Sequence, residues 1–196
     1  TLPLSHSAFA QKQDSVNLLV QQFRPWGDPD GILQTQSAKT LRQWNFKLGL
    51  FLNYTKDPLI LRDNQGNRGI GILKHQLGAD FVAGLGLFSW LDIELSIPLT
   101  IYQSGSLPDS VVTSNLHGLD VSGFAMSDPR IGLKIQALRE KKHWLSLGFQ
   151  FYLGIPLGSE KKLNGGEGLS YGIRLFASKK ISIVNLALNF GYRHSP

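Results

Sequence analysis

The stretch that decides the fold is residues 144–157, which read W-L-S-L-G-F-Q-F-Y-L-G-I-P-L. Large apolar side chains occupy every odd position, namely Leu145, Leu147, Phe149, Phe151, Leu153, Ile155 and Leu157. Small, polar or water-tolerant residues occupy the even positions from 146 to 156. A strict period of two predicts a β-strand with one apolar and one polar face. The stretch exceeds the usual soluble strand of about 5–6 residues, and it is long enough for the roughly 9–11 residues with which a tilted strand crosses a bilayer.

The same alternation recurs in six other stretches of the chain. We predict further strands at 42–56, 73–88, 91–104, 129–138, 169–177 and 181–193. The connections between the seven strands alternate in length: a long hairpin turning at 63–67, then 89–90, 105–128, 139–143, 158–168 and 178–180. Short turns at one end and long loops at the other are typical of outer-membrane barrels.

Composition and charge agree with a barrel that crosses a membrane with strands. Charged residues make up 17% of the chain, below the usual quarter, and no run of about 18 apolar residues predicts a membrane helix. The absence of cysteine excludes disulfides and thiolate metal sites. The net charge is +6, but the basic residues are scattered in loops and turns, which argues against nucleic acid. Anionic lipid headgroups are the expected partners of this basic rim.

We therefore predict an all-β fold: an antiparallel transmembrane β-barrel with short periplasmic turns and long outer loops. About seven strands are recognisable, whereas a single-chain barrel normally has an even number, so the complete barrel should have at least eight. Two open sheet edges in lipid would leave backbone groups unpaired. The missing strand could lie within residues 1–41, come from a neighbouring chain, or belong to a longer protein of which this is a part; we favour the last.

Three segments are expected along the chain. Residues 1–10 end in Ala8-Phe9-Ala10, an A-x-A pattern typical of a signal-peptide remnant, with an ordinary N-terminal arm as the alternative. Residues 11–41 form an N-terminal segment without sustained alternation, in which 14–23 could form a short helix and 25–31 are turn-rich. Residues 42–196 form the barrel, which we expect to be truncated.

The alternation predicts two sets of functional side chains, one in the lumen and one at the membrane interfaces. Charged residues of both signs fall on the polar parity and are predicted to line the lumen: Lys47, Asp80, Asp92, Glu94, Arg130, Lys134 and Arg174. Such charges would be costly in the dry core of a soluble sandwich, which is the main alternative fold. Aromatic residues sort by strand end, as membrane interface belts do, with Trp44, Trp90 and Trp144 at the periplasmic end and Tyr54, Tyr102 and Tyr192 at the outer end.

Several short motifs carry a family resemblance over residues 24–193. They are D-P-L-I-L-R-D at 57–63, H-Q-L at 75–77, P-L-T-I-Y-Q-S-G at 98–105, S-D-P-R-I-G at 127–132 and I-P-L-G at 155–158. In these motifs and their order the chain resembles the barrel part of OmpA-family outer-membrane proteins of predatory and gliding bacteria. The resemblance implies a porin-like barrel followed by a periplasmic peptidoglycan-binding domain. That domain is not in this chain, so peptidoglycan is a partner only through a domain not present here. Some similar barrels are homo-oligomers that enclose lipid.

These observations predict a porin-like or structural barrel in the cell outer membrane. We expect it to be a homo-oligomer in contact with membrane lipid and lipopolysaccharide, with no chemistry of its own, no catalytic residue, no metal and no cofactor. The charged lumen residues could pair and plug a narrow barrel, which we favour, or line a channel in a wider one.

Two other functions stay open. A barrel enzyme acting on lipid or lipopolysaccharide would use His75, an unexpected polar residue on the lipid-facing parity, with Ser104, Asp128 or His117 near it. A surface receptor or adhesion barrel would use the apolar residues of the long loops at 57–72 and 105–127, although these loops could also fold over the barrel mouth as a lid.

Overall fold

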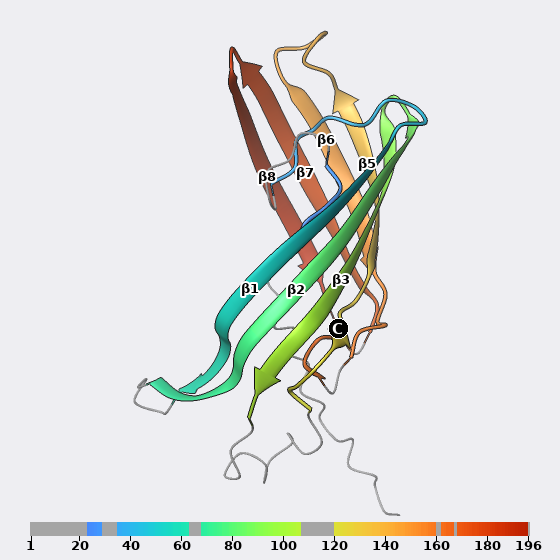
Figure 1. The fold of residues 1–196 in the computed structure, drawn as a ribbon. Helices are drawn as coiled ribbons and strands as arrows, with labels where there is room; N and C mark the ends of the chain where they lie inside the picture. Colours follow the sequence, from blue (N-terminus) through green and yellow to red (C-terminus); the bar gives the residue numbers. More distant parts are fainter. Residues whose placement is uncertain are drawn as a thin grey trace, which may run out of the picture.

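The computed structural model describes residues 23–28, 35–62, 68–106, 120–159, 162–166 and 168–195. Within these ranges the chain forms one antiparallel sheet and no α-helix. Its main strands pair in the order β1 (Phe46–Arg62), β2 (Arg68–Phe88), β3 (Leu91–Gly105), β5 (Arg130–Leu138), β6 (Ser146–Gly154), β7 (Ser170–Ile181) and β8 (Val184–His194). The sheet curls into a half-barrel (Figure 1), which confirms the predicted all-β antiparallel fold with barrel-like curvature.

The connections give the sheet two distinct ends. We call the end with the connections at 89–90, 139–145 and 182–183 the short-turn end, and the opposite end the long-loop end. The first hairpin reaches farther toward the long-loop end than the strand ranges predicted at 42–56 and 73–88, because β1 and β2 stay paired as far as Arg62 and Arg68. Register shifts after Lys56 interrupt the two-residue period there, so alternation alone could not follow the strands.

Other predicted boundaries were also wrong. The last turn lies at Ser182 and Ile183 rather than at 178–180. Lys179 belongs to strand β7, and its ammonium lies 3.8 Å from the centre of the Trp144 ring. The strand predicted at 144–157 ends at Gly154, since Pro156 has no N–H to continue the ladder. The loop predicted at 105–128 contains a two-residue strand, β4 (Ala125–Met126), which pairs with β3.

The two faces of the sheet have opposite character. Along β6 the buried side chains are small or polar apart from Tyr152, and they alternate with exposed Leu147, Phe149 and Phe151. The same alternation holds in β3 and β5, where charged side chains take the buried positions. The apolar face is thus the exposed convex one and the polar face is the covered concave one.

The concave face is covered by the N-terminal strap, by which we mean residues 23–28 and 35–42. The strap runs inside the curl and crosses the short-turn end before it enters β1 (Figure 1). Its backbone donates to side chains of β3, β7 and β8, from Leu41 N to Asp92, Ala38 N to Ser178 and Gln36 N to Asn189, at 2.8–3.1 Å. The signal-peptide remnant predicted at 1–10 lies outside the described residues, as does the helix predicted at 14–23 except for Phe23, which is not helical.

The outer edges of β1 and β8 face no further strand among the described residues. Seven successive antiparallel strands make β1 and β8 run in the same direction. Closing the sheet with antiparallel pairs therefore takes an odd number of additional strands between them. This agrees with the even strand count expected for a complete barrel.

Glycine at position 86 should be required for the passage of the strap. A Cβ there would lie 2.3 Å from the carbonyl oxygen of Arg42, so the strap would have to move. We expect Gly86→Ala to lower the free energy of unfolding by about 1–3 kcal/mol, as overpacking does. Urea titration of the folded protein measures this. The control is Gly191→Ala, whose nearest neighbour at 3.2 Å is the flexible Arg174 side chain. Equal losses in both variants would contradict the role assigned to the strap.

Candidate functional site: the polar interior of the half-barrel

The residues predicted to line a lumen all lie on the concave face of the sheet. Five of them have side chains that the strap and neighbouring strands bury almost completely: Asp80, Asp92, Glu94, Arg130 and Lys134. Lys47 and Arg174 are half-buried on the same face. The seven residues thus share one face of the sheet, and their role in lining a lumen stays a prediction.

Asp28 of the strap is the centre of this interior, and sequence reasoning missed it. Its carboxylate accepts from Lys134 Nζ at 2.5 Å, with both side chains almost fully buried, and from the backbone N–H of Ser37 at 2.8 Å. The ammonium of Lys47 donates to the Asp28 carbonyl oxygen. The sequence P-W-G-D-P-D-G at 25–31 indicated only a turn, so nothing local pointed to an ion pair 106 residues away.

The other buried carboxylates also find donors. Asp92 accepts from the backbone N–H of Leu41 at 2.8 Å. Glu94 accepts from the side-chain amides of Gln36, at 3.0 Å, and Gln150. The amide of Asn53 donates to Asp80 at 2.8 Å. Burying an ion without partners is costly in free energy, and these hydrogen bonds lower that cost for the three carboxylates.

Arginine and aromatic side chains fill the space beside the carboxylates. Arg130 donates to Ser96 at 2.9 Å and lies 4.7 Å from the centre of the Trp26 ring. Arg174 packs over the same ring and over Tyr152, and the two rings meet edge to face at 5.5 Å. Guanidinium–aromatic contacts of this kind are favourable when water is excluded. Trp26 is therefore buried on the concave side between the guanidinium groups of Arg130 and Arg174 and the ring of Tyr152.

A second polar cluster surrounds Asn164 toward the long-loop end. Its side-chain oxygen accepts from Thr100 at 3.0 Å and its amide donates to Gln103 at 2.8 Å. Asp128 binds the backbone N–H groups of Gly158 and Gly166, both at 2.9 Å, and so fixes the loop that carries Asn164. At the surface beside this cluster, the hydrogen bond from Ser122 lowers the pKa of Asp120.

The six aromatic residues predicted as an interface belt are all exposed and separate by end. Trp44, Trp90 and Trp144 lie at the short-turn end. Tyr54 and Tyr102 flank Leu77 in one row across β1, β2 and β3 toward the long-loop end, and Tyr192 lies near the end of β8. Exposure at the two ends is what a belt requires; contact with a membrane interface stays a prediction.

The residues proposed for a barrel enzyme are only partly brought together. His75 pairs with Ser104 across β2 and β3, and its Nδ1 lies 2.7 Å from the hydroxyl of Tyr54 on the same face. Asp128 belongs to the cluster around Asn164 on the concave side, and His117 lies outside the described residues. The described part of this group has a histidine and hydroxyls but no carboxylate directed at them.

The buried ion pair yields a stability prediction. Asp28→Ala leaves Lys134 charged and buried without its partner, so we expect a loss of about 3–5 kcal/mol in the free energy of unfolding. The double variant Asp28→Ala with Lys134→Met removes the uncompensated charge and should recover most of this loss. Denaturant titration of both variants provides the measurement.

The matched control is the exposed ion pair between Asp120 and Lys162. Asp120→Ala should leave the unfolding midpoint almost unchanged, because water screens that pair. If Asp28→Ala were as mild as Asp120→Ala, the interior described above would not hold the fold together.

The described residues contain no group of three or more His, Cys, Asp or Glu side chains that could hold a metal ion. No helix in the described part of the chain is long and apolar enough to cross a membrane. In comparisons with known proteins, no family model, no curated protein and no solved structure matches the chain.

Proposed function

We propose that the chain is a structural, porin-like β-barrel of the cell outer membrane, as its resemblance to OmpA-family barrels implies. The observation that carries the proposal is the inverted polarity of the sheet. Charges and amides are buried on the concave face, while rows of Leu, Ile, Phe and Val are exposed on the convex face. A protein stable in water on both sides would bury the second set and expose the first.

The convex apolar surface is continuous rather than scattered. On β1 the side chains of Phe46, Leu48, Leu50 and Leu52 are 54–73% exposed, and on β8 Leu186, Leu188 and Phe190 are 54–64% exposed. Burying each such side chain is worth about 1.5–3 kcal/mol. Contiguous apolar surface on this scale marks a partner or a membrane. Hydrocarbon on this face would supply that burial without any change in the fold.

Strand length and aromatic placement support the same proposal. β5 and β6 have 9 residues each and β8 has 11, which suits a tilted strand crossing a bilayer. Exposed Trp residues at one end and Tyr residues at the other suit the two headgroup layers. The orientation then follows the usual rule, with the short-turn end toward the periplasm and the long loops outside.

The interior supports a plugged barrel rather than an open channel. The strap places Trp26, Asp28 and Gln36 in the curl, and the buried Asn164 cluster occupies its inner side toward the long-loop end. No step of this function needs a catalytic residue or a cofactor. The shape of the barrel, its loops and its contacts with lipid and lipopolysaccharide would perform the role.

Homo-oligomerisation is part of the proposal, and the sheet edges constrain its form. Copies related by an axis along the membrane normal would place β8 of one copy beside β1 of the next. These strands run in the same direction, so direct backbone pairing there would be parallel. Contacts through the convex side chains avoid this restriction, and they could enclose lipid.

The proposal predicts a strict requirement for an amphiphile. We expect the folded chain to be monodisperse in a mild detergent and to precipitate when the detergent is removed, since the convex face would then meet water. Size-exclusion chromatography with light scattering measures both states. A monodisperse particle in plain buffer would refute a membrane location.

The same experiment tests the oligomer. Light scattering that separates protein from detergent mass should give a multiple of the 21.7 kDa chain. A protein mass of one chain in detergent would remove the homo-oligomer and leave the membrane barrel intact.

A further inference from the structure

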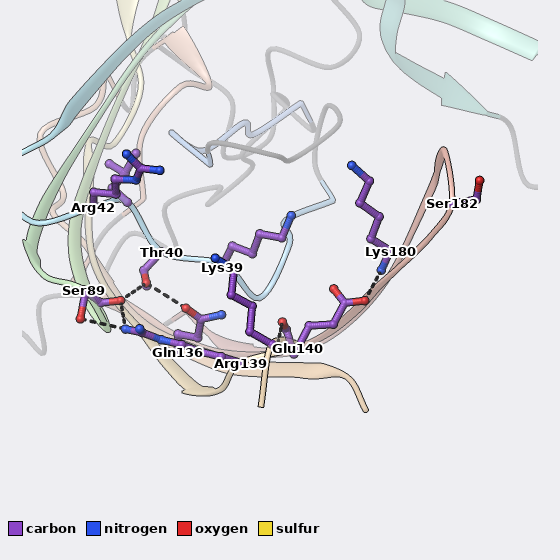
Figure 2. Close-up of a pocket in the computed structure, with 12 residues that line it drawn as sticks. Lys39, Thr40, Arg42, Ser89, Gln136, Arg139, Glu140, Lys180 and Ser182 are labelled. Carbon is purple, nitrogen blue, oxygen red and sulfur yellow. Dashed lines mark hydrogen bonds between the residues drawn. The ribbon is translucent and has the colours of Figure 1, made fainter. Parts of the chain in front are cut away.

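A cavity of about 740 Å³ opens at the short-turn end, outside the polar interior described above. Its walls come from the strap and all three short connections (Figure 2): Lys39, Thr40, Leu41, Arg42, Ser89, Gln136, Arg139, Glu140, Lys141, Ser146, Lys180 and Ser182. Five of these twelve residues are cationic and one is acidic. The lining thus carries a net charge of +4, taken as five positive minus one negative.

The one acid of the lining is already engaged. The carboxylate of Glu140 accepts from the backbone N–H of Lys180 at 3.0 Å, and the backbone N–H of Glu140 donates to Ser146 at 3.1 Å. The first bond ties the β5–β6 connection to the end of β7, and the second ties it to the start of β6. Glu140 therefore serves to shape the cavity, and its charge offsets only a small part of the surrounding positive charge.

The floor of the cavity is held in place by hydrogen bonds between elements. The hydroxyl of Thr40 donates to the carbonyl of Ser89 at 2.9 Å and lies 3.2 Å from the amide oxygen of Gln136. The guanidinium of Arg139 donates to the hydroxyl of Ser89 at 2.8 Å. Figure 2 shows Arg42 and Lys39 of the strap on one side of this floor and Lys180 of β7 on the other. The fold thus places five cationic side chains around one recess.

We infer that this cavity binds a phosphate-bearing anion. Guanidinium and ammonium groups are the usual partners of phosphate oxygens, and five of them line this recess. A recess lined by one sign of charge also concentrates the opposite ion. The volume falls within the roughly 300–1000 Å³ of small-molecule sites and exceeds what a single phosphate fills, so a ligand with more than one phosphate or with an attached headgroup fits best.

Two sources offer this chemistry at the short-turn end. One is a soluble phosphorylated compound, represented by inorganic pyrophosphate. The other is the headgroup of an anionic phospholipid, represented by phosphatidylglycerol. The site itself does not depend on the proposed membrane location, because its residues and bonds are properties of the fold.

Binding is tested with the full chain in a neutral detergent at low salt. Titration calorimetry should give saturable binding of pyrophosphate, weaker binding of inorganic phosphate, and a decline with added salt. For the lipid source, binding is measured to neutral nanodiscs with and without phosphatidylglycerol. Saturation by pyrophosphate alone identifies a soluble ligand, and saturation by the lipid alone identifies a headgroup.

The decisive variant is Arg42→Gln with Lys180→Gln, which removes two cations of the lining and keeps side-chain size. Its affinity for whichever probe binds should fall at least about tenfold, because two charge-assisted contacts to phosphate oxygens are lost. The control is Lys56→Gln with Lys142→Gln, two exposed lysines outside the lining, which should bind within about twofold of the original chain. Equal weakening in both variants, or no saturable binding of either probe, would overturn the inference.

Discussion

The structure depends on finding partners for the charged and polar side chains that alternation places on the inner face of the sheet. Neither lysine nor carboxylate can be left dry and unpaired. The strap supplies one partner to each of three such residues: Asp28 meets Lys134, Gln36 meets Glu94, and Leu41 meets Asp92. Gln36 also exchanges two hydrogen bonds with Asn189, so the strap joins β3 to β8 over the concave face of the sheet.

The strap can take this path because glycines on the inner face leave room for its backbone. The carbonyl oxygen of Gly27 would lie 3.1 Å from a Cβ at Gly84, and a Cβ at Gly148 would lie 3.2 Å from the carbonyl oxygen of Ala38. Larger residues at these points would keep the strap away from the strands. The glycines thus leave space on the inner face, and the strap fills that space.

Much of the sheet could be predicted from sequence because the relevant signal is local. Alternation in 91–104 and 129–138 gave β3 and β5 to within about one residue, and the parity of Lys134 gave the face on which it lies. The last turn was misplaced because Lys179 and Lys180 resemble a turn by charge, whereas the structure keeps them in β7. The strap could not be predicted, since Asp28 and Gln36 find partners 106 and 153 residues away and no periodicity marks such contacts.

The central claim is that hydrocarbon covers the convex face, and residue-by-residue accessibility tests it most directly. The chain has no cysteine, so single cysteines can be placed at Phe149, Leu175 and Leu188 on the convex face and at Lys142 in a short turn. Nitroxide labels at these sites in lipid vesicles report collision with oxygen, which enters lipid, and with a water-soluble nickel chelate. The account predicts that oxygen reaches the three convex labels while the chelate is excluded from them, and that the chelate reaches the label at 142. If the chelate reached the convex labels as readily as the label at 142, the account would be contradicted.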